Sequence, residues 1–84
     1  MTISPRATAV RFDDHMFWVD LEDGRTLGIP LAWYPRLLHG TPTLREQVTI
    51  SVTGLHWEEL DEDISIAGLI AGKADYALSR KQAA

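Results

Sequence analysis

The sequence predicts an α+β domain in which an antiparallel sheet of about four strands packs on two to three short helices. Two observations carry this prediction. Apolar and polar residues alternate in four segments, as they do along strands that bury one face. Proline, glycine and capping residues then mark the starts and ends of short helices in the second half. With no internal repeat or linker, we treat residues 1–84 as a single domain.

The four predicted strands cover residues 8–13, 16–22, 25–29 and 48–53. The last segment, Val48-Thr49-Ile50-Ser51-Val52-Thr53, is the clearest, because three β-branched apolar residues alternate with three hydroxyl-bearing ones. Side chains two positions apart lie on the same face of a strand, so each segment can turn its apolar side chains toward a core.

The turns of the first three strands follow from the requirement that apolar side chains share one face. A two-residue loop at Asp14-His15 pairs residue 12 with 17 and residue 10 with 19. A two-residue loop at Asp23-Gly24 would place Leu27 beside Asp20. We therefore prefer a three-residue loop at 22–24, which pairs 19 with 27 and 17 with 29 and needs positive φ at Gly24. The shared face then carries Val10, Phe12, Phe17, Val19, Leu21, Leu27 and Ile29.

Two short helices are predicted after the third strand. Pro35 suits the first turn of a helix, and Gly40 can end that helix. Thr41 then looks like an N-cap followed by Pro42 at the first helical position, which starts a second helix over residues 43–47.

A third helix is predicted over roughly residues 64–71, ended by Gly72. Asp61 or Asp63 can cap it, and the acidic residues before it favour the positive end of its dipole. Residues 73–84 form either a final helical turn or two or a frayed tail.

We expect these helices to cover the inner face of the sheet. Trp18 and Met16 point away from this core, near Ala9 and Arg11, either as a flank packed against the tail or as part of an interface. The helical residues expected to cover the sheet are Leu37, Leu38, Leu44, Ile66, Leu69 and Ile70.

The net charge of −4 is unevenly distributed. Residues 58–72 carry five acidic residues and no Lys or Arg. The chain therefore lacks the basic surface that phosphate binding requires, and we do not expect direct binding of nucleic acid. The acidic run suits a basic partner protein, although a solvated surface or a helix start explains it equally simply.

The chain contains no cysteine, which excludes disulfides and thiolate metal sites and fits a cytoplasmic protein. No apolar run is long enough to span a membrane, and the first residues lack the apolar core of a signal peptide. An 84-residue chain has a thin core, so a homodimer or a partner protein would help to stabilise it.

No recognised catalytic motif is present, so we do not expect an enzyme or a cofactor. His15 is expected in a turn, and His56 in a structural hydrogen bond. The run from Asp61 begins like a calcium loop. It then has Ile66 where that loop needs glycine and Gly72 where it needs glutamate, so no metal site is expected.

Three aromatic residues, Trp33, Tyr34 and Trp57, fall in connecting segments between the predicted elements. They either close the open ends of a thin core or form an interface anchor beside Arg36, because Trp, Tyr and Arg dominate binding hot spots.

Four blocks of the sequence occur in an order and spacing that are specific, although each block alone would be weak. The blocks are Leu21-Glu22-Asp23-Gly24-Arg25, Pro30-Leu31-Ala32-Trp33-Tyr34-Pro35-Arg36-Leu37, Arg45-Glu46, and His56-Trp57 leading to Leu60-Asp61-Glu62-Asp63-Ile64-Ser65. In these residues the chain resembles a bacterial family of small domains of unknown function, domain of unknown function 2442, and the resemblance covers about residues 9–72.

The resemblance implies a small α+β domain, often encoded beside another small domain in pairs suspected to be toxin–antitoxin modules. This chain would be the antitoxin-side partner. Some relatives carry an added helix-turn-helix domain, for which these 84 residues leave no room, so DNA autoregulation is not expected. No catalytic residues are established for the family.

We therefore expect a protein-binding module, the neutralising partner of a small basic toxin. The alternatives are a small enzyme or ligand binder with a pocket near Trp33, His56 and Trp57, and an acidic inhibitor that occupies a nucleic-acid-binding site on another protein. The candidate contact residues are Trp18, Trp33, Tyr34, Arg36, His56, Trp57, Glu58, Asp61, Glu62 and Asp63.

Overall fold

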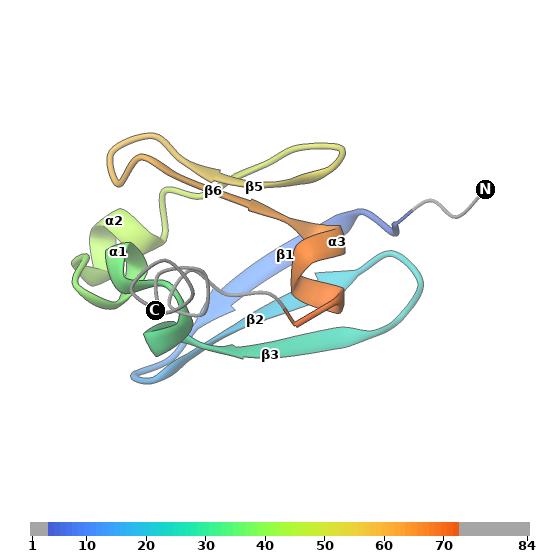
Figure 1. The fold of residues 1–84 in the computed structure, drawn as a ribbon, viewed down its shortest axis with the longest axis horizontal. Helices are drawn as coiled ribbons and strands as arrows, with labels where there is room; N and C mark the ends of the chain where they lie inside the picture. Colours follow the sequence, from blue (N-terminus) through green and yellow to red (C-terminus); the bar gives the residue numbers. More distant parts are fainter. Residues whose placement is uncertain (1–3, 73–84) are drawn as a thin grey trace, which may run out of the picture.

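A computed structural model describes residues 4–72 as two small antiparallel sheets that face each other, with short helices at both ends (Figure 1). The predicted α+β class is confirmed, although the strands number six and form two sheets rather than one. In chain order the elements are β1 (Ala7–Phe12), β2 (Met16–Leu21), β3 (Thr26–Pro30), η1 (Leu31–Trp33), α1 (Pro35–Leu38), α2 (Pro42–Arg45), β4 (Thr49–Ile50), β5 (Gly54–Trp57), β6 (Glu62–Ser65) and α3 (Ile66–Ile70).

The first sheet has the predicted register. Residue 12 pairs with 17 and residue 10 with 19 across β1 and β2. Residue 19 pairs with 27 and residue 17 with 29 across β2 and β3. Gly24 has a φ of 94°, and the amide of Leu21 donates to the carbonyl of Arg25 over 2.8 Å. Both predicted turns are therefore confirmed.

Trp18 lies half-buried on the outer face of this sheet. Its indole Nε1 donates to Oδ2 of Asp13 over 2.9 Å. The ring covers Gly28 on β3, where an added Cβ would lie 2.4 Å from a ring carbon. The tryptophan thus packs on its own sheet, and the absent side chain at Gly28 gives it room.

The second half forms more strand than predicted. Only Thr49–Ile50 of the expected strand over 48–53 lies in β4, and a tight turn then leads into β5. The β5–β6 hairpin pairs His56 with Asp63 and was not predicted. Because β5 and β6 are four residues each, their alternation is too short to stand out from connecting sequence.

The predicted start of the third helix was wrong. Residues 62–65 form β6, and the helix begins only after Ser65, whose Oγ accepts the amide of Gly68 over 2.9 Å. Asp61 precedes the strand with a φ of 51°, in the left-handed region that Asp tolerates better than most residues. Pairing with β5 therefore outweighs the attraction of these acids for a helix N-terminus.

The two predicted proline-initiated helices are confirmed. Pro35 and Pro42 occupy the first turns of α1 and α2, and Oγ1 of Thr41 accepts the amide of Leu44 over 3.2 Å. The guanidinium of Arg45 donates to the last carbonyls of α1, which joins the two helices. The residues of the predicted tail, 73–84, lie outside the described part of the chain.

The core lies between the two sheets rather than between one sheet and helices. Trp57, 1% exposed, points from β5 toward Phe17 on β2, with ring centroids 6.4 Å apart and planes at 81°. Of the helical residues expected to cover the sheet, Leu38 and Ile70 are exposed instead. The buried apolar residues are Ala7, Phe17, Val19, Leu21, Ile29, Leu31, Tyr34, Leu37, Leu55, Trp57, Ile64, Ile66 and Leu69.

Gly54 is a sensitive position in this arrangement. A Cβ there would lie 2.3 Å from the carbonyl oxygen of Ile64, so the two strands would have to separate. We expect Gly54→Ala to lower the free energy of unfolding by about 1–3 kcal/mol. Chemical denaturation measures the effect, with the exposed Thr43→Ala variant as a control expected to change it by less than about 0.5 kcal/mol. Equal effects of the two substitutions would contradict the close approach of β5 and β6.

Candidate functional site

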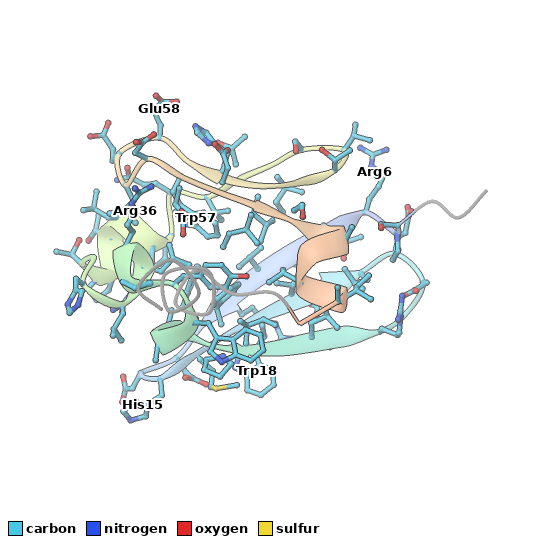
Figure 2. All side chains as sticks on the ribbon, viewed as in Figure 1. Arg6, His15, Trp18, Arg36, Trp57 and Glu58 are labelled. Atoms are coloured by element: carbon cyan, nitrogen blue, oxygen red, sulfur yellow. The ribbon has the colours of Figure 1, made fainter. Side chains whose placement is uncertain are left out.

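The outer face of the β5–β6 hairpin is the candidate site. Alternation along the strands turns Trp57 and Glu62 inward and the paired residues His56 and Asp63 outward. The turn between the strands carries Glu58, which lies at the tip of the hairpin (Figure 2). One short hairpin therefore presents an imidazole and several carboxylates on the side away from the core.

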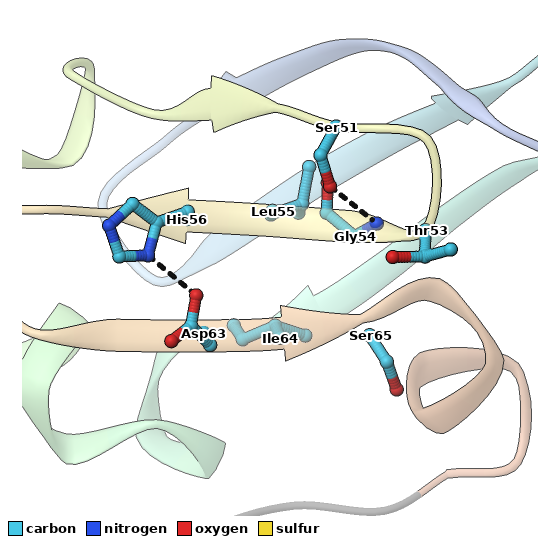
Figure 3. Close-up of a pocket in the computed structure, with 8 residues that line it drawn as sticks. All are labelled: Ser51, Thr53, Gly54, Leu55, His56, Asp63, Ile64 and Ser65. Atoms are coloured by element: carbon cyan, nitrogen blue, oxygen red, sulfur yellow. Dashed lines mark hydrogen bonds and ion pairs between the residues drawn. The ribbon is translucent and has the colours of Figure 1, made fainter.

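His56 lies between two carboxylates. Its Nδ1 is 2.5 Å from Oδ1 of Asp63 on the neighbouring strand, as Figure 3 shows. Its Nε2 is 2.9 Å from Oε1 of Glu58 in the turn. An imidazolium has a donor on each nitrogen and can satisfy both contacts at once. The hydrogen bonds to Glu58 and then to Asp63 raise the pKa of His56 above its ordinary value.

Arg36 of α1 contacts the same hairpin at Asp61 and Glu62. Its guanidinium donates to the backbone carbonyl of Asp61, and its Nη1 lies 3.7 Å from Oε2 of Glu62. Glu62 is only 4% exposed. Arg36 therefore holds the hairpin turn against α1, and Glu62 belongs to the interior.

The predicted contact residues divide into three groups. Tyr34, Trp57 and Glu62 are buried, so they cannot be surface anchors in this structure. Trp18 and Trp33 are half-buried, and Trp18 lies on the other sheet, away from Glu58 (Figure 2). The residues on or beside the exposed hairpin are Arg36, His56, Glu58, Asp61 and Asp63.

Burial favours the interpretation in which Trp33, Tyr34 and Trp57 close the open ends of a thin core. Tyr34 packs edge-on against Phe17 with centroids 6.0 Å apart, and Trp57 closes the same cluster. Trp33 is half-buried against the core. These rings complete a thin core, as expected for residues that close its open ends.

Two of the side chains predicted to line one pocket with Trp33 point to opposite faces, because His56 and Trp57 are neighbours on β5. A shallow groove of about 370 Å³ lies instead along the outer face of the hairpin (Figure 3). The lining residues are Ser51, Thr53, Gly54, Leu55, His56, Asp63, Ile64 and Ser65.

Two serine hydroxyl groups of this groove hold the backbone in place. Oγ of Ser51 donates to the carbonyl of Gly54 and accepts its amide, and Oγ of Ser65 caps α3. No chemical signal in the sequence marked the groove, since its hydroxyls alternate with apolar residues as in any exposed strand. The absent side chain at Gly54 is the one local clue.

The carboxylates do not converge on a common point, because Asp63 and Glu58 contact opposite nitrogens of the imidazole. Within residues 4–72 no group of three His, Asp or Glu side chains is arranged to hold a metal ion. The exposed carboxylates give this face negative charge and hydrogen-bond acceptors. No helix in this described range is long and apolar enough to cross a membrane.

The fold and the site define a small α+β domain of two facing antiparallel sheets with an acidic surface hairpin. The chain matches the family model described as "Protein of unknown function (DUF2442)" over residues 7–75, and it belongs to that family. The family predicted from the sequence is thereby confirmed.

Two solved structures are similar to this chain. A protein of unknown function from Rhodospirillum rubrum ATCC 11170 shares 37% identity, with a TM-score of 0.74 over 86% of this chain and 92% of that one. An uncharacterised protein from Chromobacterium violaceum shares the fold at 23% identity, with a TM-score of 0.71 over 82% of this chain and 67% of that one. No curated protein matches the chain.

The raised pKa of His56 has a consequence for stability. The protonated form of His56 is favoured in the folded protein. Its contribution to the free energy of unfolding is therefore fully present below about pH 6.5, and it is lost as the pH rises through the elevated pKa. We expect the Asp63→Asn variant to lower the pKa of His56, as followed by NMR titration of the imidazole. The control is Asp14→Asn, which removes one exposed carboxylate from the β1–β2 turn. A pKa of His56 that is identical in the wild type and the Asp63→Asn variant would contradict the contact.

Proposed function

We propose that this protein is a non-catalytic, cytoplasmic binding module that contacts a basic partner protein through its β5–β6 hairpin. In the finer form of the proposal the partner is a small toxin, and this chain is its neutralising, antitoxin-side partner. The observation that carries the proposal is the cluster of exposed acidic side chains on one hairpin.

The charge of the hairpin supports a basic partner. Glu58, Glu59, Asp61 and Asp63 are all exposed, and no Lys or Arg occurs between Glu46 and Gly72. Arg36, which reaches the turn from α1, is engaged with Asp61 and Glu62. A surface of one sign steers an oppositely charged partner and disfavours partners of like charge.

The anchoring contacts of the hairpin support binding as well. Trp57 anchors one strand in the core, and Arg36 fixes the turn. Acidic groups held on an ordered hairpin lose little conformational freedom when a partner binds, which favours affinity. The same surface would suit the alternative in which the basic partner is a nucleic-acid-binding protein whose site this chain occupies.

Charge reversal at the hairpin tests the proposal. We expect Glu59→Lys to weaken capture of a basic protein from the native cells at least tenfold, because it places a positive charge on the contact surface. The matched control is Asp14→Lys, which makes the same charge change on an exposed residue of the β1–β2 turn. Quantitative mass spectrometry of the captured protein measures both effects.

The finer form of the proposal needs a second readout. Expression of the captured partner alone should stop growth, and co-expression of this chain should restore it. A partner that is harmless alone would contradict the antitoxin role. Equal capture by Glu59→Lys and the wild type would contradict the hairpin as the contact surface.

A further inference from the structure

β4 lies at the edge of the second sheet and carries no charge. The strand order is β4-β5-β6, so one side of β4 is open. β1 lies near β4, but no backbone hydrogen bond joins the two among residues 4–72. From Val48 to Leu55 the chain has no charged residue and no proline. Sheet edges are usually protected by such residues, and an unprotected edge is available to another strand.

The side chains of this edge are also apolar and accessible. Ile50 is 39% exposed and Val52 is 63% exposed, whereas the residue that pairs with Ile50, Leu55, is buried. Large hydrophobic residues left exposed beside an open edge gain from being covered.

The backbone of Ile50 faces the open side. The amide of Ser51 donates to the carbonyl of Gly54 over 2.9 Å and therefore points toward β5. Successive backbone groups of a strand point in opposite directions, so the amide and carbonyl of Ile50 point away from β5. A second strand laid along this edge would find both groups available.

We propose that β4 pairs with β4 of a second copy of this chain, antiparallel and centred on Ile50. The sequence Val48-Thr49-Ile50-Ser51-Val52 has the same pattern in both directions. In this register Ile50 lies opposite itself and Thr49 lies opposite Ser51, while Val52 lies in the turn that leads into β5. A pair related by a two-fold axis needs a surface that complements itself, and the pattern of this segment meets that requirement.

The charge of the chain favours a second copy at this edge. The molecule is acidic overall, yet the uncharged edge lets two copies approach without placing like charges opposite each other. A stable interface buries about 1,600 Å² in total, more than a few strand residues supply, so the dimer is weak and depends on concentration.

The two joined sheets form one six-stranded sheet. Because the two-fold axis is perpendicular to this joined sheet, the acidic hairpins of both copies lie on the same side of the sheet. This pairing does not depend on the proposed function.

The register makes a specific prediction about position 50. Ile50→Lys and Ile50→Glu each place like charges opposite each other, so each variant alone should remain monomeric where the wild type dimerises. An equimolar mixture of the two variants should dimerise, because lysine then faces glutamate. Sedimentation velocity over a concentration series measures the wild type, the two variants and their mixture, and Thr43→Lys on α2 is the control for added charge.

Each result decides for or against the pairing. A wild type that stays monomeric up to millimolar concentration overturns it, as does undiminished dimerisation of Ile50→Lys. A mixture that fails to associate overturns the register. If substitution at Ile50 prevents folding, the exposed Thr49→Lys takes its place, because the register puts its two lysines diagonally opposite each other, and an unchanged dimer of that variant overturns the proposal.

Discussion

The packing of Trp57 between the two sheets is the interaction on which the rest of the structure depends. Its ring meets Phe17 of the facing sheet edge-on, and its Nε1 donates to the carbonyl of Arg45 over 2.8 Å. The guanidinium of Arg45 in turn holds the end of α1. One buried side chain thus connects both sheets and both proline-initiated helices. Because neighbouring residues of a strand face opposite sides, the inward position of Trp57 also sets His56 outward.

The alternation of side chains along β6, set by the inward position of Trp57, gives adjacent acidic residues different environments. Asp61 occupies the left-handed turn, Glu62 is buried beside Arg36, and Asp63 faces solvent and contacts His56. Only the outward residues can contribute to a contact surface. The charge of the hairpin therefore depends on strand alternation as well as on composition. An apolar, uncharged edge lies next to this acidic face, so one small sheet carries two chemically different surfaces.

The first sheet could be predicted because its register depends on local rules. A three-residue loop at 22–24 puts Phe17, Val19 and Ile29 on a common face where a two-residue loop does not, and Gly24 permits the turn that this requires. The helices at Pro35 and Pro42 were predictable for a similar reason, since proline and a capping threonine act within one turn. Family membership followed from the order and spacing of short blocks.

The second sheet and the site could not be predicted in the same way. The acids before residue 64 suit a helix N-terminus and a hairpin equally well, and their pairing with β5 depends on Trp57 finding Phe17 some 40 positions earlier. Burial of Tyr34 and Glu62 also depends on contacts between distant segments. The contact between His56 and Asp63 needs the β5–β6 register, which no local pattern specifies.

The most direct test of the packing of the two sheets is a double-mutant cycle between Phe17→Leu and Trp57→Leu. Chemical denaturation of the wild type, the two single variants and the double variant gives the coupling free energy between the rings. Edge-to-face contact predicts a coupling of about 0.5–1.5 kcal/mol beyond the loss of buried area. Strictly additive effects of the two substitutions would contradict the contact and with it the facing arrangement of the two sheets.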